Sequence, residues 1–152
     1  MTIFINNYLN YHINNFDMKL GFIGLGRMGF NMVLNLKDHK IDAVAYNRHP
    51  EPARKIKNLG VETAFSVEEL MRKLPKQKII WIMVTAGKPV DIIIDEITPY
   101  LNANDIIIDG GNSFYKDSIR RYKKLKNKKI HFLDIGTSGG LSGARHGACL
   151  TI

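Results

Sequence analysis

Short apolar runs recur along this chain, and each is separated from the next by a more polar segment. Such runs, when bounded by turn residues, are typical of β-strands. We predict six strands from them, at residues 19–23, 41–46, 61–64, 79–84, 105–109 and 130–135. The fourth run, IIWIMV, is apolar at successive positions, which is typical of a central parallel strand that is covered on both faces.

The segments between these runs have the spacing of amphipathic helices. Apolar residues first recur at helical spacing at Met28, Met32, Val33 and Leu36. Further helices are predicted at residues 50–59, from the capping box of Ser66 and Glu69 to Lys73, from Pro89 to about Leu101, and along the apolar stripe of Tyr115, Ile119, Tyr122 and Leu125.

The alternation of strands and helices predicts the fold class. Parallel neighbours need crossover connections, which are nearly always right-handed, so we expect an α/β fold with a doubly wound parallel sheet of the Rossmann type. A chain of 152 residues is long enough for one such domain, which we place at residues 18–152. Ligands of these sheets bind beyond the carboxyl ends of the strands.

Residues 1–17 do not share this pattern. They contain five Asn and no Lys or Arg, so they lack the basic start of a secretory signal. The recognisable pattern begins only at Met18. We therefore expect residues 1–17 to be an extension outside the fold and Met18 to be the natural start.

The composition restricts the class of protein. It is 45% hydrophobic and 24% charged, as in ordinary globular proteins, and no apolar run approaches the ~20 residues of a membrane-spanning helix. Cys149 is the only cysteine, which excludes a disulfide within the chain, and no His or Cys cluster has the spacing of metal ligands. We expect a cytoplasmic protein that binds neither a membrane nor a metal ion.

The formal net charge of +8 comes largely from one cluster. Seven cations fall within residues 120–129, namely Arg120, Arg121, Lys123, Lys124, Lys126, Lys128 and Lys129. Cations at a helix end oppose the negative end of the helix dipole, so we interpret the cluster as the solvated end of a helix. A polyanion site is the alternative, but few aromatic residues interleave the cluster, and we do not predict nucleic-acid binding.

A glycine motif lies directly between the first predicted strand and the first helix. It has the form G-x-G-x-x-G and consists of Gly24, Leu25, Gly26, Arg27, Met28 and Gly29. The first glycine permits a tight turn, the second lets the backbone approach a pyrophosphate, and the third lets the helix pack close to the sheet. Because of its position, we interpret the motif as a dinucleotide-binding loop rather than a merely flexible turn.

The end of the second strand indicates which dinucleotide is bound. An NAD-selective domain presents a carboxylate there, whereas this chain has Asn47, Arg48 and His49. Arg48 can pair with the 2′-phosphate of NADP and lie against its adenine, while Asn47 can donate an amide hydrogen bond. NADP is therefore favoured over NAD, unless Arg48 is only a surface arginine.

Three segments together carry a family resemblance: GFIGLGRMGFNM at 21–32, DGGNSFYKDSIRR at 109–121 and GTSGGLSGARHGACLTI at 136–152. They resemble the cofactor domain of the 6-phosphogluconate dehydrogenases. The first segment also fits the wider group of 3-hydroxyacid dehydrogenases, such as 3-hydroxyisobutyrate dehydrogenase. The Gly-Gly-Asn-Ser turn and the Gly-Ala-Arg sequence favour the phosphogluconate enzymes.

The resemblance implies further site residues. Asn112 would contact substrate and lie near the nicotinamide, although Asn112-Ser113 also fits a helix cap. The residues implied to hold the sugar acid are Ser138, Gly139 and Gly140, and those implied to line the cofactor are Met28, Val84, Thr85 and Ala86. Thr85 departs from the lysine of many relatives, which leaves one cofactor contact in doubt.

Two histidines are also considered as site residues. His131 and His146 have no acid or nucleophile partner in the sequence, and we interpret both as structural or surface residues.

The resemblance also implies a reaction. Members of the family oxidise 6-phosphogluconate with NADP, release carbon dioxide and protonate the enediol to give ribulose 5-phosphate. Their general base and general acid, a lysine and a glutamate, lie beyond the position of Ile152, as does the helical domain that supplies dimer contacts in these homo-oligomers. We therefore expect no catalytic residue in this chain, which would bind NADP without turnover. A 3-hydroxyacid dehydrogenase, a non-catalytic NADP-binding module and a decayed gene product are the alternatives.

Overall fold

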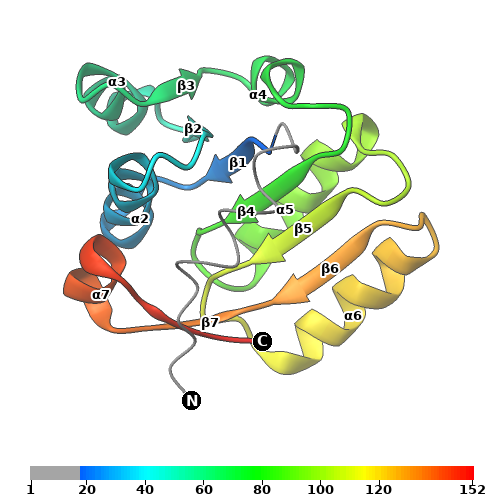
Figure 1. The fold of residues 1–152 in the computed structure, drawn as a ribbon. Coiled ribbons are helices and arrows are strands. Elements are labelled where there is room, and N and C mark those ends of the chain that lie inside the picture. The colour runs from blue at the N-terminus through cyan, green and yellow to red at the C-terminus, as the bar shows by residue number, and fades with distance from the viewer. Residues whose placement is uncertain (1–17) are drawn as a thin grey trace, which may run out of the picture.

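The computed structural model describes residues 18–152, and the extension predicted at residues 1–17 lies outside the described residues. The main sheet has six parallel strands in the order β3-β2-β1-β4-β5-β6 (Figure 1). The strands are β1 (Leu20–Ile23), β2 (Ala43–Tyr46), β3 (Glu62–Ala64), β4 (Ile79–Ile82), β5 (Ile106–Asp109) and β6 (His131–Asp134). This order places a switch point between β1 and β4, as in doubly wound dinucleotide-binding sheets.

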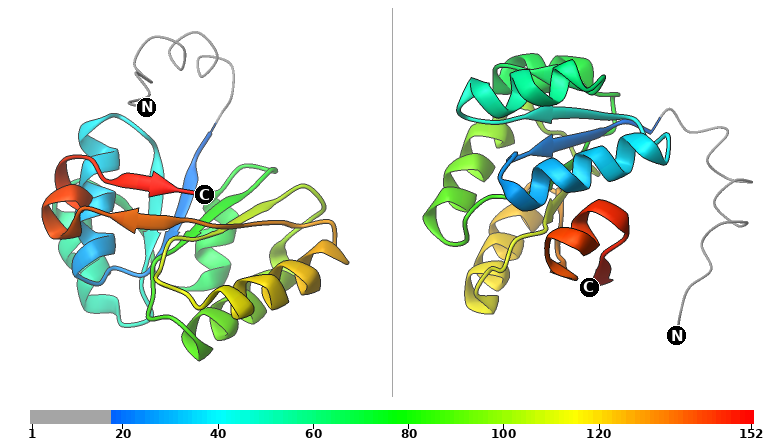
Figure 2. Two further views of the ribbon diagram at one scale, coloured as in Figure 1. Left: turned by 90° about the horizontal axis from the view of Figure 1, so that it is seen from below. Right: turned by 90° about the vertical axis from the view of Figure 1, so that its left-hand side faces the viewer.

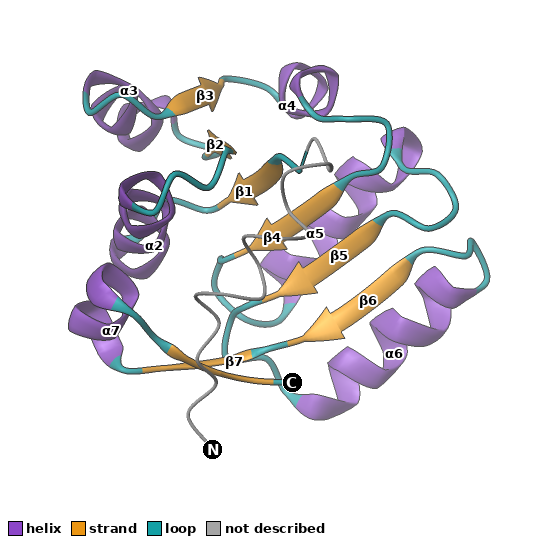
Figure 3. Cartoon of the chain, in the orientation of Figure 1, coloured by secondary structure: helices purple, strands orange, loops and turns teal. Residues whose placement is uncertain are grey.

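Helices cover both faces of this sheet (Figure 3). On one face, α2 and α3 pack against a core that contains Phe22, Ala45 and Trp81. On the other, α4, α5 and α6 pack against a core that contains Ile23, Ile80 and Ile107. The helices are α2 (Arg27–Asp38), α3 (Pro50–Asn58), α4 (Val67–Lys73), α5 (Lys88–Ile97) and α6 (Tyr115–Lys126), with a short 3-10 helix η2 (Thr98–Tyr100) after α5.

These elements confirm the predicted fold class and all six predicted strands. The Ser66 half of the predicted capping box is present, because its hydroxyl accepts a hydrogen bond from the Glu69 amide at 3.0 Å. The Glu69 carboxylate reaches back one residue beyond the N-cap and accepts from the Phe65 amide at 2.8 Å. The helix predicted to run to about Leu101 instead ends at Ile97, where the chain tightens into η2 around Pro99.

A small C-terminal unit was not predicted. Strand β7 (Gly136–Ser138) pairs antiparallel with β8 (Cys149–Thr151), and the short helix α7 (Gly140–His146) joins them. Figure 2 shows the unit beside the main sheet, with α7 packed against α2. Arg145 of α7 also pairs with Asp38 of α2 at 2.6 Å. The residues at 138–140 therefore form the end of a strand and the start of a helix.

The predicted apolar stripe of α6 is wrong, and the predicted solvated cluster is wrong for Arg121 alone, since its other six cations are exposed. Of its predicted apolar stripe, only Leu125 is buried, whereas Tyr115, Ile119 and Tyr122 are 60%, 49% and 45% exposed. The face of α6 that meets the sheet instead carries Arg121, which is 1% exposed and cannot belong to a solvated cationic cluster. The reason is that the sheet presents the buried carboxylate of Asp109 to this face, and a cation satisfies it better than an apolar side chain would.

Candidate functional site

The glycine loop between β1 and α2 is packed too closely to accept side chains at two of its three glycines. Gly24 has a φ of 105°, and a Cβ there would lie 2.3 Å from the carbonyl oxygen of Met83. A Cβ at Gly29 would lie 2.0 Å from the carbonyl oxygen of Gly24. At Gly26, by contrast, a Cβ would meet nothing within 4 Å, because this position faces open space. The loop is thus tightly packed against the protein at Gly24 and Gly29 and open to solvent at Gly26, which we call its open front.

The amino terminus of α2 follows this open front. Its N-cap is Gly26, which makes no side-chain cap hydrogen bond, and its first turn holds no acidic residue. The first amides of a helix have no partner within the helix and carry the positive end of its dipole. The geometry is therefore suited to an anionic group such as a pyrophosphate.

A cleft of about 760 Å³ opens in front of the loop. It lies at the carboxyl ends of the strands, which are aligned because Ile23 pairs with Ile82, Ile82 with Asp109 and Asp109 with Asp134. The residues predicted for the site that line it are Gly26, Arg27, Met28, Gly29, Val84, Thr85, Ala86, Asn112 and Ser138. The volume falls in the range of small-molecule and cofactor pockets.

Other predicted residues lie beside the cleft rather than in its wall. Gly24 and Leu25 are buried behind the loop, and Gly139 and Gly140 are exposed beyond the end of β7. Sequence reasoning missed several lining residues, namely Met83, Gly110, Gly111, Gly136, Thr137 and Thr151. Gly136, Thr137 and Thr151 belong to the unpredicted β7–β8 pair, so no helix or strand pattern pointed to them.

Asn47 has a structural role that the sequence did not reveal. Its side-chain oxygen accepts a hydrogen bond from the Leu25 amide at 2.8 Å, and its side-chain nitrogen donates to the His49 carbonyl at 2.9 Å. Asn47 therefore ties the glycine loop to the end of β2. Arg48 and His49 are exposed at the same strand end.

A smaller hollow of about 310 Å³ lies on the α3 side of the glycine loop. Lys55 of α3 and Arg27 both line it. Arg48 is exposed at the end of the neighbouring β2 and adds a third positive charge on this side of the site, which favours a phosphorylated ligand there.

The loop after β5 places Asn112 at the cleft. Asn112 is exposed, and the alternative interpretation of Asn112-Ser113 as a helix cap is wrong, because the N-cap of α6 is Phe114 and makes no side-chain cap bond. The Ser113 hydroxyl instead donates to Asp109 at 2.7 Å. Ser138 also lines the cleft and is exposed, and the neighbouring Thr137 hydroxyl donates to the Gly110 carbonyl at 3.2 Å.

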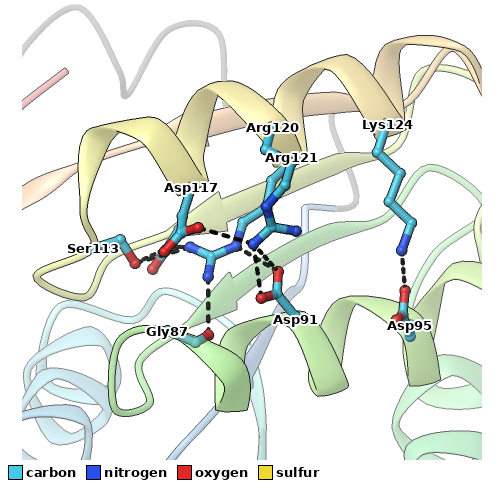
Figure 4. Close-up of polar contacts among 9 residues, drawn as sticks. Gly87, Asp91, Asp95, Ser113, Asp117, Arg120, Arg121 and Lys124 are labelled. Carbon is cyan, nitrogen blue, oxygen red and sulfur yellow. Dashed lines mark hydrogen bonds and ion pairs between the residues drawn. The ribbon is translucent and has the colours of Figure 1, made fainter.

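Below this loop, the Arg121 guanidinium joins several elements (Figure 4). It donates to Asp91 of α5 at 2.9 Å and to Asp109 at 3.2 Å. Burial by itself would raise the pKa of Asp91, but hydrogen bonds from Arg121 and Arg120 outweigh it and hold this pKa below its usual range. Asp91 therefore stays ionised at neutral pH.

The two histidines that were predicted to be structural or surface residues lie away from the cleft. His131 is exposed at the start of β6, the end of the strand opposite the cleft, and His146 is exposed on α7 with Nδ1 3.2 Å from the Ser142 carbonyl oxygen. Both agree with the interpretation as surface residues. Within residues 18–152, no group of three or more His, Cys, Asp or Glu is placed to hold a metal ion, and no helix is long and apolar enough to cross a membrane.

The strand order, the glycine loop and the cleft at the switch point define the class of protein: it is a Rossmann-type dinucleotide-binding domain. Residues 19–152 match the family model described as the NAD binding domain of 6-phosphogluconate dehydrogenase. The chain therefore belongs to the 6-phosphogluconate dehydrogenase family, which is a family of oxidoreductases.

Individual relatives agree with this assignment. The chain is 46% identical over 137 residues to a decarboxylating 6-phosphogluconate dehydrogenase of Chlamydia pneumoniae, and 44% identical over 136 residues to one from Saccharomyces cerevisiae. These matches cover 85% and 86% of this chain but only 28% of each relative. The chain therefore spans less than a third of the length of these two relatives, and 45% of the length of a relative from Bacillus subtilis.

Solved structures give the same result. The 6-phosphogluconate dehydrogenase of Plasmodium falciparum, described in complex with its cofactor NADP⁺ and with its substrate 6-phosphogluconate, superimposes with a TM-score of 0.82 at 37% identity. That match covers 88% of this chain and 30% of the other. A 3-hydroxyisobutyrate dehydrogenase of Mycobacterium tuberculosis has a TM-score of 0.75 at 22% identity, which shows a shared fold and no more.

Proposed function

We propose that this chain is the NADP-binding part of an enzyme that oxidises and decarboxylates 6-phosphogluconate to ribulose 5-phosphate. The observation that carries the proposal is the open position of Gly26 at the amino terminus of α2, in front of a cleft of about 760 Å³. A pyrophosphate fits there because no Cβ blocks its approach to the helix amides. The match to the Plasmodium enzyme with NADP⁺ supports the choice of cofactor.

Different residues of the cleft would bind the pyrophosphate, the nicotinamide and the sugar acid. The amides of α2 bind the pyrophosphate, while Met28, Val84 and Ala86 supply apolar surface beside the nicotinamide and exclude water. When bound, the nicotinamide supplies the hydride acceptor. Asn112 and Ser138, which both line the cleft, would orient the sugar acid through their amide and hydroxyl groups. Gly139 and Gly140 would add backbone amides next to Ser138.

At Thr85, the short exposed hydroxyl cannot reach as far as the lysine of many relatives. We therefore assign Thr85 to the wall of the site and not to an ionic contact with the cofactor. Charge toward the cofactor phosphates comes instead from Arg27 and Arg48. We further propose that the enzyme is cytoplasmic, as the lone cysteine predicts, and that it is homo-oligomeric at full length, as the family resemblance implies.

The preference for NADP can be measured by calorimetric titration of the purified chain with NADP and, separately, with NAD. We expect NADP to bind more tightly, and Arg48→Ala to weaken NADP binding by about tenfold to a hundredfold, the effect of losing one charge-assisted hydrogen bond. NAD binding should change little. The matched control is Arg54→Ala, which removes an exposed arginine from the neighbouring α3. An unchanged ratio of NADP to NAD affinity in Arg48→Ala would refute the role of Arg48.

Turnover by the chain alone is a separate prediction. The general base and general acid implied by the family resemblance are not among these residues, so we expect NADP binding without reduction. Absorbance at the NADPH band, followed after mixing the purified chain with NADP and 6-phosphogluconate, should stay flat. Steady NADPH production would show that these residues contain the missing acid and base.

A further inference from the structure

One arginine of α6 is buried far more deeply than its sequence neighbours. Arg121 is 1% exposed, whereas the side chains of Arg120 and Lys124 on the same helix are 53% and 48% exposed. Burying a guanidinium is costly unless each of its donors is satisfied. Here each of the three guanidinium nitrogens donates at least one hydrogen bond, and the four acceptors are Asp91, Asp109, Ser113 and the carbonyl oxygen of Gly87.

Two of these partners, Gly87 and Ser113, belong to the loops after β4 and β5, which line the cleft. Gly87, whose carbonyl accepts from Arg121 at 2.9 Å, ends the loop that contains Val84, Thr85 and Ala86. Ser113, whose hydroxyl lies 3.1 Å from Arg121, follows Asn112 directly. A single buried cation therefore joins the loop after β4 to the loop after β5.

The carboxylate of Asp109 completes the arrangement around Asn112. One of its oxygens accepts from the Gly111 amide at 3.1 Å, and the other accepts from the Ser113 hydroxyl at 2.7 Å and from Arg121 at 3.2 Å. Both neighbours of Asn112 are thus anchored to the same carboxylate, which is itself 0% exposed. We call Arg121, Asp109 and Ser113 the loop clamp.

The two ends of a dinucleotide would meet different parts of this structure. In a sheet of this topology the cofactor crosses the switch point, with its adenosine on the β2 side and its nicotinamide on the β4–β5 side. The adenosine side is held by Asn47, whose bonds to Leu25 and His49 do not involve the loop clamp. The clamp therefore acts on the nicotinamide side alone.

We infer that the loop clamp positions the walls of the nicotinamide and substrate end of the cleft, so that Arg121, Asp109 and Ser113 are positioning residues for the site. This inference rests on the proposed function. A buried ion pair by itself is weak evidence of a stabilising role, since apolar side chains of similar volume often do as well. What apolar side chains cannot do is fix two loops by directed hydrogen bonds, and binding sites depend on such fixed geometry.

The test compares two ligands that share the adenosine end. NADP reaches both sides of the switch point, whereas 2′,5′-ADP carries the 2′-phosphate and adenine but no nicotinamide. In Ser113→Ala and Arg121→Lys we expect NADP binding to weaken about tenfold, while binding of 2′,5′-ADP changes by less than about twofold. The matched control is Lys124→Ala, which breaks an exposed ion pair between α6 and Asp95 of α5 and touches neither loop.

The outcomes separate the inference from the proposed function. If both ligands lose affinity equally, or if neither does, the clamp is merely structural or irrelevant, and the inference is overturned. If the unaltered chain binds neither ligand, the proposed function fails and the inference fails with it. Should Arg121→Lys not fold, as judged by circular dichroism, Ser113→Ala decides the question, because it removes one hydroxyl and leaves the Arg121–Asp109 pair intact.

Discussion

Replacing Gly29 with alanine is expected to destabilise the domain by about 3 kcal/mol and to abolish cofactor binding. The new Cβ would lie 2.0 Å from the carbonyl oxygen of Gly24, which is backbone and cannot rotate away. Helix α2 would have to move off β1 and would carry its first-turn amides with it. Urea unfolding followed by the fluorescence of Trp81, the only tryptophan of the chain, measures the loss of stability.

The matched variant is Gly26→Ala, at the open glycine of the same loop. Its Cβ would meet no atom within 4 Å, and the backbone there, with a φ of −67° and a ψ of −175°, suits alanine. We expect a free energy of unfolding within about 1 kcal/mol of the unaltered chain, but weak NADP binding, because the methyl group occupies the path of the pyrophosphate. Equal losses of stability in the two variants would show that the loop is not packed as described.

Replacing Arg121 with methionine is expected to cost about 3–5 kcal/mol of stability, because it leaves the carboxylate of Asp109 buried without its cation. Asp109 is 0% exposed and its hydrogen-bonding partner Ser113 cannot supply a charge. The same urea titration measures this effect. Lys124→Ala is again the control and should have little effect, since exposed ion pairs contribute little.

A double variant distinguishes a lost ion pair from lost packing. When Asp109→Asn is added to Arg121→Met, the amide oxygen can still accept from Gly111, and no unpaired charge remains. We therefore expect the double variant to be more stable than the sum of the two single losses predicts, by about 1–3 kcal/mol of coupling. Strict additivity would mean that Arg121 contributes by its volume and not by its charge.

The parts of this protein that local patterns describe were predictable. The hydrophobic periodicity of a strand or a helix is visible within a short stretch of sequence. The alternation of strands and helices, the sheet type and the junction of β1 with α2 therefore followed from residues that are neighbours in sequence. The glycine motif was interpretable for the same reason: its three glycines act on the loop in which they lie. Local pattern also placed Asn47, Arg48 and His49 directly after the second strand.

The tertiary structure decided what depends on distant partners. Nothing in the pattern of α6 indicated that Arg121 would be buried, because its partners Asp91 and Asp109 lie on other elements, and the apolar spacing of Tyr115, Ile119 and Tyr122 favoured the wrong face. The β7–α7–β8 unit was missed because its glycines interrupt any helical or strand period.

Likewise, the cleft exists only where segments far apart in sequence meet at the carboxyl ends of the strands. The amino-acid sequence by itself therefore determined the helices, the strands and the glycine loop. Which charged side chains are buried, and which loops meet to form the site, depends on the tertiary structure. The physical reason is that hydrophobic periodicity is a property of neighbouring residues, while the satisfaction of a buried charge is a property of the whole packed structure.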